Sequence, residues 1–121
     1  MAPNGMIADA VQVPRLASPP DSFRGIFRTD ADALAVYSEG AGIARVIPRA
    51  VAVPVDIEDV QTLVRWAHAT DTPIIPRGSG SGMAGGAVGD GVILDMSRIR
   101  AVSAVNAAAK TVFAEPGATW M

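Results

Sequence analysis

A dense cluster of glycines between two apolar runs constrains the fold more than any other feature of the chain. Seven of its twelve glycines fall within the fourteen positions from Gly78 to Gly91. The flanking runs, TPIIPR (72–77) and GVILDMS (91–97), have the apolar and β-branched character of strands. Fourteen residues are a long connection, since ordinary ones hold about 2–6 residues. Ordering so many glycines is costly, which favours a binding role for the loop.

Two helices are predicted before this loop. The clearer one, IEDVQTLVRWAHAT (57–70), begins after a cap at Asp56, and its apolar residues Ile57, Val60, Leu63, Val64 and Ala67 recur at helical spacing. The shorter one, ADALAVYSE (31–39), follows a cap at Thr29 or Asp30, with Leu34, Ala35 and Tyr37 on its apolar face. Both helices are expected to cover a sheet.

Short runs rich in β-branched residues predict the strands of that sheet. The run 49–55 is closed by Pro54, and the run 72–77 is expected to be fully buried. The runs 101–106 and 110–117 are expected to be joined by a turn at Asn106 to Ala109. The predicted strands are 49–55, 72–77, 91–97, 101–106 and 110–117. Strands that alternate with helices and then follow one another directly are typical of an α/β (α+β) fold with short strands and flanking helices.

Composition excludes several classes of function. The chain has no cysteine, and His68 is its single histidine, so it cannot form a thiolate site, a histidine-rich metal site or a His-dependent triad. Its net charge of −2, with scattered basic residues, argues against nucleic-acid binding. No stretch reaches the ~20 apolar residues of a membrane span. The default expectation is a soluble cytoplasmic protein without a metal.

The two ends of the chain are expected to differ in organisation. Residues 1–28 contain several prolines and are expected to be a loose lead-in, whereas residues 29–121 are expected to be the N-terminal part of one folded domain. Thr119 stands where a helix cap belongs, two residues before the last. The expectation is therefore the N-terminal part of a longer protein, truncated at its C-terminus.

Three interpretations of the glycine-rich loop compete. GSGMAG, Gly80 to Gly85, fits the Rossmann fingerprint G-x-G-x-x-G. That mechanism also needs a helix whose N-terminus meets a pyrophosphate, and an acid about 20 residues later. The following glycines leave little room for a helix, and Arg100 stands where the acid would be. A nucleotide-binding Rossmann fold is therefore the less favoured interpretation.

The second interpretation is a phosphate cradle built without a helix. Glycines let successive backbone N–H groups turn toward one anion, and Ser79 and Ser81 add hydroxyl donors. Arg77 either offers positive charge or braces the loop. The third interpretation is a surface loop whose glycines serve only as turns.

The sequence resembles a known flavoprotein family in three segments. These are PRGSGSGMAGGAV (76–88), VILDMSRI (92–99) and EPGAT (115–119), which are specific in combination, in order and at this spacing. Residues 34–121 resemble the N-terminal FAD-binding half of the vanillyl-alcohol oxidase / p-cresol methylhydroxylase (PCMH) family. The resemblance is greatest to the branch of D-lactate dehydrogenases and the flavin subunit of glycolate oxidase. It implies the first subdomain of a PCMH-type FAD-binding domain.

The resemblance also implies which residues hold the cofactor. In that family the backbone amides of the matching loop bind the FAD pyrophosphate, the later glycines continue beside the cofactor, and a Pro-Gly turn approaches it. The implied cofactor-binding residues are Arg77, Gly78, Ser79, Gly80, Ser81, Gly82, Gly85, Gly86, Pro116 and Gly117. Members with covalent FAD carry a histidine at about Ser81, so non-covalent FAD is implied here.

The family context implies an FAD-dependent oxidoreductase that oxidises a 2-hydroxy acid. In such enzymes the substrate-binding residues come from later parts of the chain, so no catalytic residue is assigned here. The 121-residue segment alone is expected to be inactive and to bind FAD weakly or not at all. Two alternatives remain open: a truncated, non-catalytic fragment, and a small flavin- or anion-binding module that needs a partner chain.

A few residues outside the loop have expected roles. Asp95 is expected to orient the backbone of its own turn in preference to touching FAD. Arg98 and Arg100 are expected to be solvated charges, Trp66 to be a packing residue and His68 to lie on a helix surface.

Overall fold

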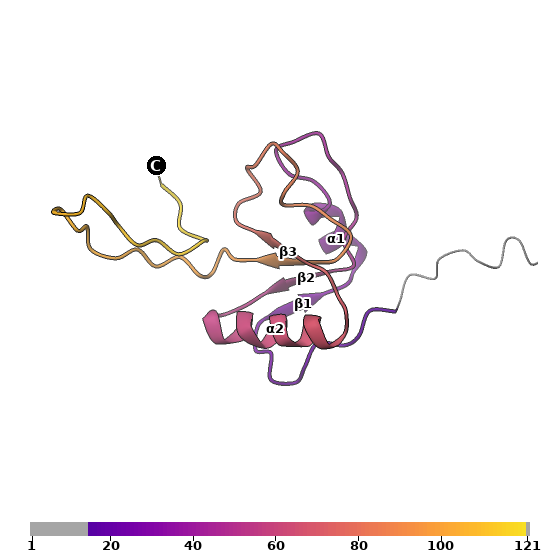
Figure 1. Cartoon of the computed structure of the whole chain (residues 1–121). Coiled ribbons are helices and arrows are strands. Elements are labelled where there is room, and N and C mark those ends of the chain that lie inside the picture. The colour runs from indigo at the N-terminus through magenta and orange to yellow at the C-terminus, as the bar shows by residue number, and fades with distance from the viewer. Residues whose placement is uncertain (1–14, 121) are drawn as a thin grey trace, which may run out of the picture.

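The computed structural model describes residues 15–120, which form a four-stranded sheet with one helix on each face and a projecting arm (Figure 1). Asp30 caps the first helix and Asp56 caps the second, because each side chain accepts a hydrogen bond from a backbone N–H of the first turn. Both predicted helices are confirmed. The elements are β1 (Ile26–Arg28), α1 (Ala31–Tyr37), β2 (Ala50–Val53), α2 (Ile57–Ala69), β3 (Ile74–Arg77) and β4 (Val92–Asp95).

The sheet has the strand order β1-β2-β4-β3. Strands β2, β4 and β3 are parallel, whereas β1 pairs antiparallel with β2. In the β3–β4 pair, Arg77 lies opposite Asp95, so these two strands end side by side. The glycine-rich loop that follows β3 and the turn that follows β4 therefore start at the same edge of the sheet.

The two faces of the sheet pack against different helices, because alternate strand residues point to opposite sides. On one face, Leu63, Trp66 and Ala67 of α2 pack against alternate residues of β2 and β4. On the other face, Ala33 of α1 packs against Val51 and Ile93. This arrangement is the expected α/β (α+β) fold of short strands with flanking helices.

The expected apolar faces of the helices are confirmed in part, since Val60, Leu63 and Ala67 of α2 and Leu34 and Tyr37 of α1 pack in the core. Ile57 and Val64 of the predicted apolar stripe of α2 remain about half exposed, and Trp66 takes the buried place. In α1 the buried residue is Ala33, whereas Ala35 is exposed. The spacing of apolar residues fixes the rotation of a helix about its own axis only to within a few tens of degrees. Contacts with neighbouring segments then set which side chains face the sheet.

Residues 15–28, which fall in the expected loose lead-in, contain a strand and contact α2. Trp66 donates a hydrogen bond from Nε1 to the carbonyl of Ser18 at 2.8 Å. The Phe27 ring meets the Trp66 ring edge to face, with 5.9 Å between centroids. Strand β1 was not predicted, since its three residues lie inside the segment assigned to the lead-in. The rest of the expected lead-in, residues 1–14, lies outside the described residues.

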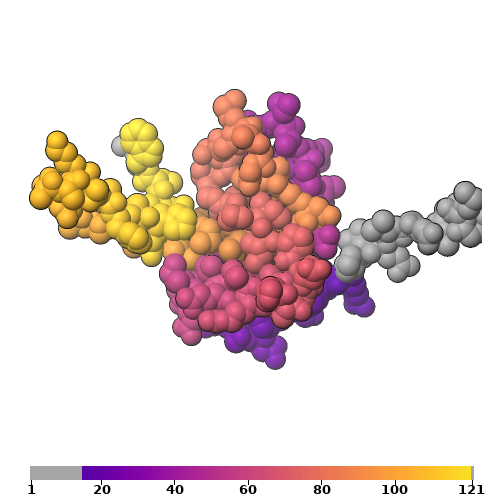
Figure 2. All heavy atoms as spheres, viewed as in Figure 1, coloured from indigo at the N-terminus to yellow at the C-terminus, as the bar shows by residue number. Residues whose placement is uncertain are grey.

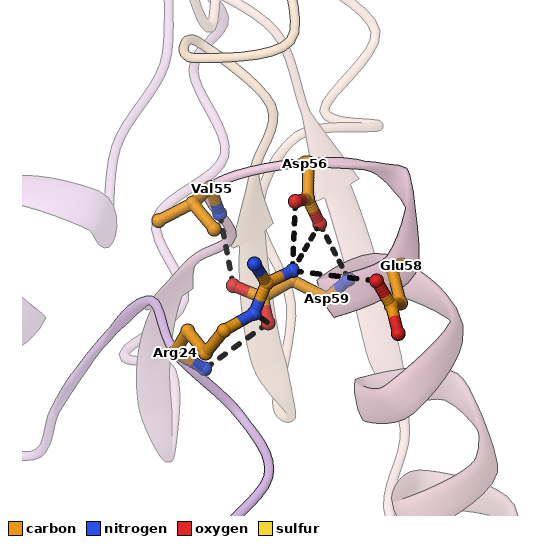
Figure 3. A network of polar contacts seen from close by, with 5 residues as sticks. All are labelled: Arg24, Val55, Asp56, Glu58 and Asp59. Atoms are coloured by element: carbon orange, nitrogen blue, oxygen red, sulfur yellow. Dashed lines mark hydrogen bonds and ion pairs between the residues drawn. The ribbon is translucent and has the colours of Figure 1, made fainter.

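An ionic network fastens this N-terminal segment to the start of α2 (Figure 3). The Arg24 guanidinium donates from Nη2 to both carboxylate oxygens of Asp56 at 2.7 Å. The buried Asp59 carboxylate accepts hydrogen bonds from the backbone N–H groups of Arg24 and Val55, each at 3.0 Å. Asp59 therefore connects three segments: the entry to β1, the exit from β2 and the first turn of α2.

Three of the predicted strands differ in the structure. Strand β3 was expected to be fully buried, but it lies at the edge of the sheet, with Pro76 exposed and the others half-buried. The segments 101–106 and 110–117 do not form regular strands. They form a narrow arm held by two isolated bridges, Val102 with Ala114 and Asn106 with Thr111. The expected turn after Asn106 is present, and the Ala109 N–H donates to the Asn106 side chain at 3.0 Å.

The described helices are short. None of those found within residues 15–120 is long and apolar enough to cross a membrane.

Candidate functional site

Three backbone segments converge at the edge where β3 and β4 end. The first is the start of the glycine-rich loop, the second is the turn after Asp95, and the third is the Pro116–Thr119 segment that returns from the arm. Backbone hydrogen bonds join them: Met96 N–H donates to the Arg77 carbonyl at 2.9 Å, and Gly117 N–H donates to the Ile99 carbonyl at 2.8 Å. Residues far apart in the sequence are thereby held in one place.

These segments enclose a pocket of about 310 Å³, hereafter the edge pocket. Half of its lining residues carry a hydroxyl group and none carries a charge. The lining residues are Gly78, Ser79, Ser81, Ser97, Pro116, Gly117, Ala118 and Thr119. A pocket that offers hydroxyl donors and has no carboxylate in its lining suits an anionic group.

Backbone donors add to this character. Within residues 15–120, none of the backbone N–H groups of residues 78–82 donates a hydrogen bond to a protein acceptor. Because N–H groups need partners, a run of such donors on a loop is suited to bind the oxygens of a phosphate. The neutral pocket would stabilise such an anion through dipoles, without a charged side chain.

The close packing of the Pro116–Thr119 segment depends on Gly117. A Cβ added at this position would overlap the carbonyl oxygens of Met96 and Ile99. Only glycine lets this segment approach the turn after β4 so closely, and that approach forms one wall of the edge pocket.

Arg77 braces the loop from behind and does not line the pocket. Its Nη1 donates to the carbonyl of Glu39 at 2.8 Å and to the carbonyl of Ala87 at 3.4 Å. Gly80 lies against this guanidinium with φ of +77°, so a side chain there would be both strained and in collision with Arg77. Of the two expected roles for Arg77, charge donor or brace, the geometry favours the brace.

The structure thus divides the residues implied by the family resemblance. Those brought together in the edge pocket are Gly78, Ser79, Ser81, Pro116 and Gly117. Gly80 is buried behind it, and Gly85 lies beside Ala44. Gly82 and Gly86 face open space and do not line the pocket.

Sequence reasoning missed three lining residues, Ser97, Ala118 and Thr119. Each lies inside a segment that carried the resemblance, VILDMSRI or EPGAT. For Ala118 and Thr119 the available signal was their adjacency to the assigned Pro116 and Gly117, and for Ser97 it was its place in VILDMSRI.

Asp95 orients the turn after its own strand, as expected. Its Oδ1 accepts a hydrogen bond from the Ser97 N–H at 2.8 Å, and its Oδ2 accepts one from the Tyr37 hydroxyl. Arg98, Arg100 and His68 are exposed, in agreement with their expected roles as surface residues.

The loop contains no helix, which contradicts the Rossmann alternative. From Gly78 to Gly91 the backbone forms turns, bends and irregular segments, and the next regular element is β4. No helix N-terminus is therefore available to meet a pyrophosphate in the Rossmann manner. Among residues 15–120 there is also no cluster of three or more metal-ligating side chains.

Residues 48–121 match the family model described as "FAD binding domain", and the chain belongs to this family. It is 29% identical over 94 residues to glycolate oxidase subunit GlcD of Escherichia coli, an alignment that covers 76% of this chain. It is 35% identical over 72 residues, 58% of this chain, to a D-2-hydroxyglutarate dehydrogenase of Xanthomonas citri.

The fold is that of the expected PCMH-type domain. A crystal structure of p-cresol methylhydroxylase superposes with a TM-score of 0.60 over 77% of this chain and 19% of the other, at 20% identity. The chain spans only 19% of the glycolate oxidase subunit and 15% of the D-2-hydroxyglutarate dehydrogenase. The resemblance seen in the sequence is therefore confirmed for the family and the fold.

Proposed function

We propose that the edge pocket holds the pyrophosphate of a non-covalently bound FAD. The observation that carries this proposal is the run of unpaired backbone N–H groups at 78–82 beside a pocket lined by hydroxyls and free of carboxylates. Membership of the FAD-binding domain family names the cofactor whose diphosphate this anion site would receive. Gly78, Ser79, Ser81, Ser97 and Thr119 are the residues proposed to contact the phosphate oxygens.

The residues present fit such a group in two respects. The side-chain-free Gly78 and Gly117 leave the pocket open to a ligand that lies against the main chain. The braced position of Arg77 supports the loop from the opposite side, so that the loop is shaped before the ligand arrives. Bound FAD supplies the redox chemistry, and the role of this chain is to bind and orient its diphosphate.

We further propose that the chain serves as the FAD-binding part of an oxidoreductase that oxidises a 2-hydroxy acid. The support is similarity to a glycolate oxidase subunit and to a D-2-hydroxyglutarate dehydrogenase, each of which is named for a 2-hydroxy acid. No residue of the edge pocket is a candidate acid or base for that reaction. Substrate would be bound by residues other than those that line this pocket.

Amide chemical-shift mapping of the purified chain with FAD and with ADP tests the binding proposal, because it detects even millimolar affinity. The expected result is saturable shifts at residues 78–82, 97 and 117–119. Gly117→Ala, which pushes on two carbonyls at the pocket wall, should weaken binding about tenfold or more, a loss of about 1.4 kcal/mol.

Ser22→Ala is the matched control, since Ser22 is exposed and distant from the edge pocket. Shifts that spread over the whole surface, or no shifts in a chain that retains its fold, would contradict FAD binding at this pocket.

A further inference from the structure

Three side chains at the ends of three different elements meet behind the edge pocket. Tyr37 is the last residue of α1, Arg77 the last of β3 and Asp95 the last of β4. The Tyr37 hydroxyl donates a hydrogen bond to Asp95 Oδ2, and the Arg77 guanidinium carbon lies 5.1 Å from the centroid of the Tyr37 ring. Tyr37 thus contacts a cation through its ring and an anion through its hydroxyl.

Each of the two charged residues holds a different wall of the pocket. The other oxygen of Asp95, Oδ1, accepts the hydrogen bond from the N–H of Ser97, which lines the pocket. Arg77 packs against Gly80 and reaches the Ala87 carbonyl at 3.4 Å, so it spans the glycine-rich loop. Tyr37 is the group that joins these two supports.

The hydroxyl of Tyr37 has a second effect, on electrostatics. Asp95 is only 8% exposed, and a carboxylate near an anion site repels the anion. Both of its oxygens are engaged, one by Tyr37 and one by Ser97. Removing the Tyr37 hydroxyl would leave one buried oxygen without its donor, and Arg77 or the Ser97 turn would have to move to compensate.

We propose that Tyr37 is a positioning residue for the diphosphate site, which acts through Asp95 on the Ser97 turn and through Arg77 on the glycine-rich loop. This inference rests on the proposed function, because it assigns Tyr37 a role in shaping the same edge pocket. Tyr37 itself does not line the pocket. Its contribution is to hold the two walls in the binding geometry before the ligand arrives.

The test compares the wild-type chain with Tyr37→Phe by amide hydrogen exchange and by FAD titration followed through amide shifts. Tyr37→Phe should speed exchange at Ser97 and weaken FAD binding about threefold to tenfold, the effect expected when one hydrogen bond is lost. Val36→Ala is the matched control, because Val36 is the preceding residue of α1 and is 69% exposed. It should change neither quantity.

A double-mutant cycle with Asp95→Asn tests whether Tyr37 acts through Asp95. If it does, the double variant should bind FAD about as weakly as the weaker single variant, so that the two effects are not additive. Full additivity would overturn the proposed coupling.

A Tyr37→Phe chain that unfolds at a lower temperature but binds FAD with wild-type affinity would show a merely structural role and overturn the inference alone. Absence of FAD-dependent shifts in a folded wild-type chain would instead overturn the proposed function, and with it this inference. The exchange measurement needs no FAD, so the two failures are distinguishable.

Discussion

Tyr37 is the single tyrosine of the chain, which makes its ionisation directly measurable. Burial, followed by the hydrogen bond to Asp95, raises the pKa of Tyr37 to about 12 from an ordinary value of 10.0. The hydroxyl therefore stays protonated and acts as a donor at every physiological pH. The same residue connects the sheet edge, the first helix and the glycine-rich loop.

The raised pKa of Tyr37 has a defined consequence for alkaline stability. Because the unfolded chain loses this proton first, the contribution of Tyr37 is fully present below pH 10 and is lost as the pH rises toward 12. The free energy of unfolding from urea denaturation should fall across this window, and Tyr37→Phe should remove that part of the fall. The phenolate absorbance of the folded chain should appear with a midpoint near 12. A midpoint near 10 would contradict the hydrogen bond to Asp95.

Arg77 shows at the same scale how a residue can matter to a site without touching its ligand. Its guanidinium is turned toward Tyr37, Glu39 and Ala87, away from the edge pocket. We expect Arg77→Lys to weaken FAD binding nearly as much as Arg77→Ala, since an ammonium has the charge but cannot reproduce the fork of donors that spans the loop. Isothermal titration of both variants with FAD gives the comparison. Wild-type affinity in Arg77→Lys would show that charge alone suffices.

At the scale of elements, the start of α2 is the point where the N-terminal segment joins the fold. The Asp59 side chain is 1% exposed, and its carboxylate accepts backbone hydrogen bonds from Arg24 and Val55 (Figure 3). Strand β1 is only three residues long and lies at the sheet edge, so its pairing with β2 depends on how its entry is anchored.

Loss of the Asp59 carboxylate should therefore destabilise the fold. Asp59→Ala leaves two backbone N–H groups without acceptors, and the free energy of unfolding should fall by about 2–4 kcal/mol. Glu58→Ala, one residue away with its side chain 82% exposed, should change it by less than about 0.5 kcal/mol. Urea denaturation of the two variants measures both values. Equal effects would show that surface charge, and not the buried acceptor, stabilises this junction.

Asp56 at the cap of α2 makes stability depend on acid. Its hydrogen bond from the Asp59 N–H, and then its pairing with Arg24, lower the pKa of Asp56 below its ordinary value of 3.8. The stabilising effect is present above pH 3.8 and is lost as the pH falls through the lowered pKa. Asp56→Asn keeps a good cap but cannot ionise. Its unfolding should therefore depend less on pH below 4 than that of the wild-type chain, as a denaturation series from pH 5 to about pH 2 would show.

At the scale of the whole molecule, the arm of residues 101–114 stands apart from the sheet (Figure 2). All of its residues are exposed, including Val105 and Phe113, each at 72%. At its base, Glu115 N–H donates to the Ala101 carbonyl at 2.9 Å, so the two ends of the arm meet. An isolated two-stranded ribbon contributes little to a hydrophobic core.

The sheet and the edge pocket should therefore survive removal of the arm. Replacing residues 102–114 by Asn-Gly, which forms a tight hairpin turn, should shift the thermal midpoint by only a few degrees. The FAD-dependent shifts at residues 78–82 should persist. Loss of cooperative melting in this variant would contradict the expectation. It would show that the arm stabilises the Pro116–Thr119 wall although all of its residues are exposed.

Local interactions explain what could be predicted from the sequence. The two helices were predicted because each cap bonds a backbone N–H within three residues, and strands β2 and β4 because their apolar runs can only be buried. The absence of a helix in the glycine-rich loop followed from the spacing of its glycines, and the family followed from the resemblance of three segments to a known one. The segment 101–117 was wrongly predicted to form two regular strands, because its β-branched residues favour strands even where no sheet is present to pair with them.

Long-range contacts decided the rest. Strand β1 exists because IFR pairs with β2 and Phe27 meets Trp66, and neither partner is near in the sequence. The direction of Arg77 depends on Glu39 and Tyr37, about forty residues earlier. By itself the sequence determined the family, the helices and the loop that carries the donors. Only the tertiary structure decided which residues line one pocket, because convergence of Gly78, Ser97 and Gly117 requires β3, β4 and the returning arm to end at the same edge.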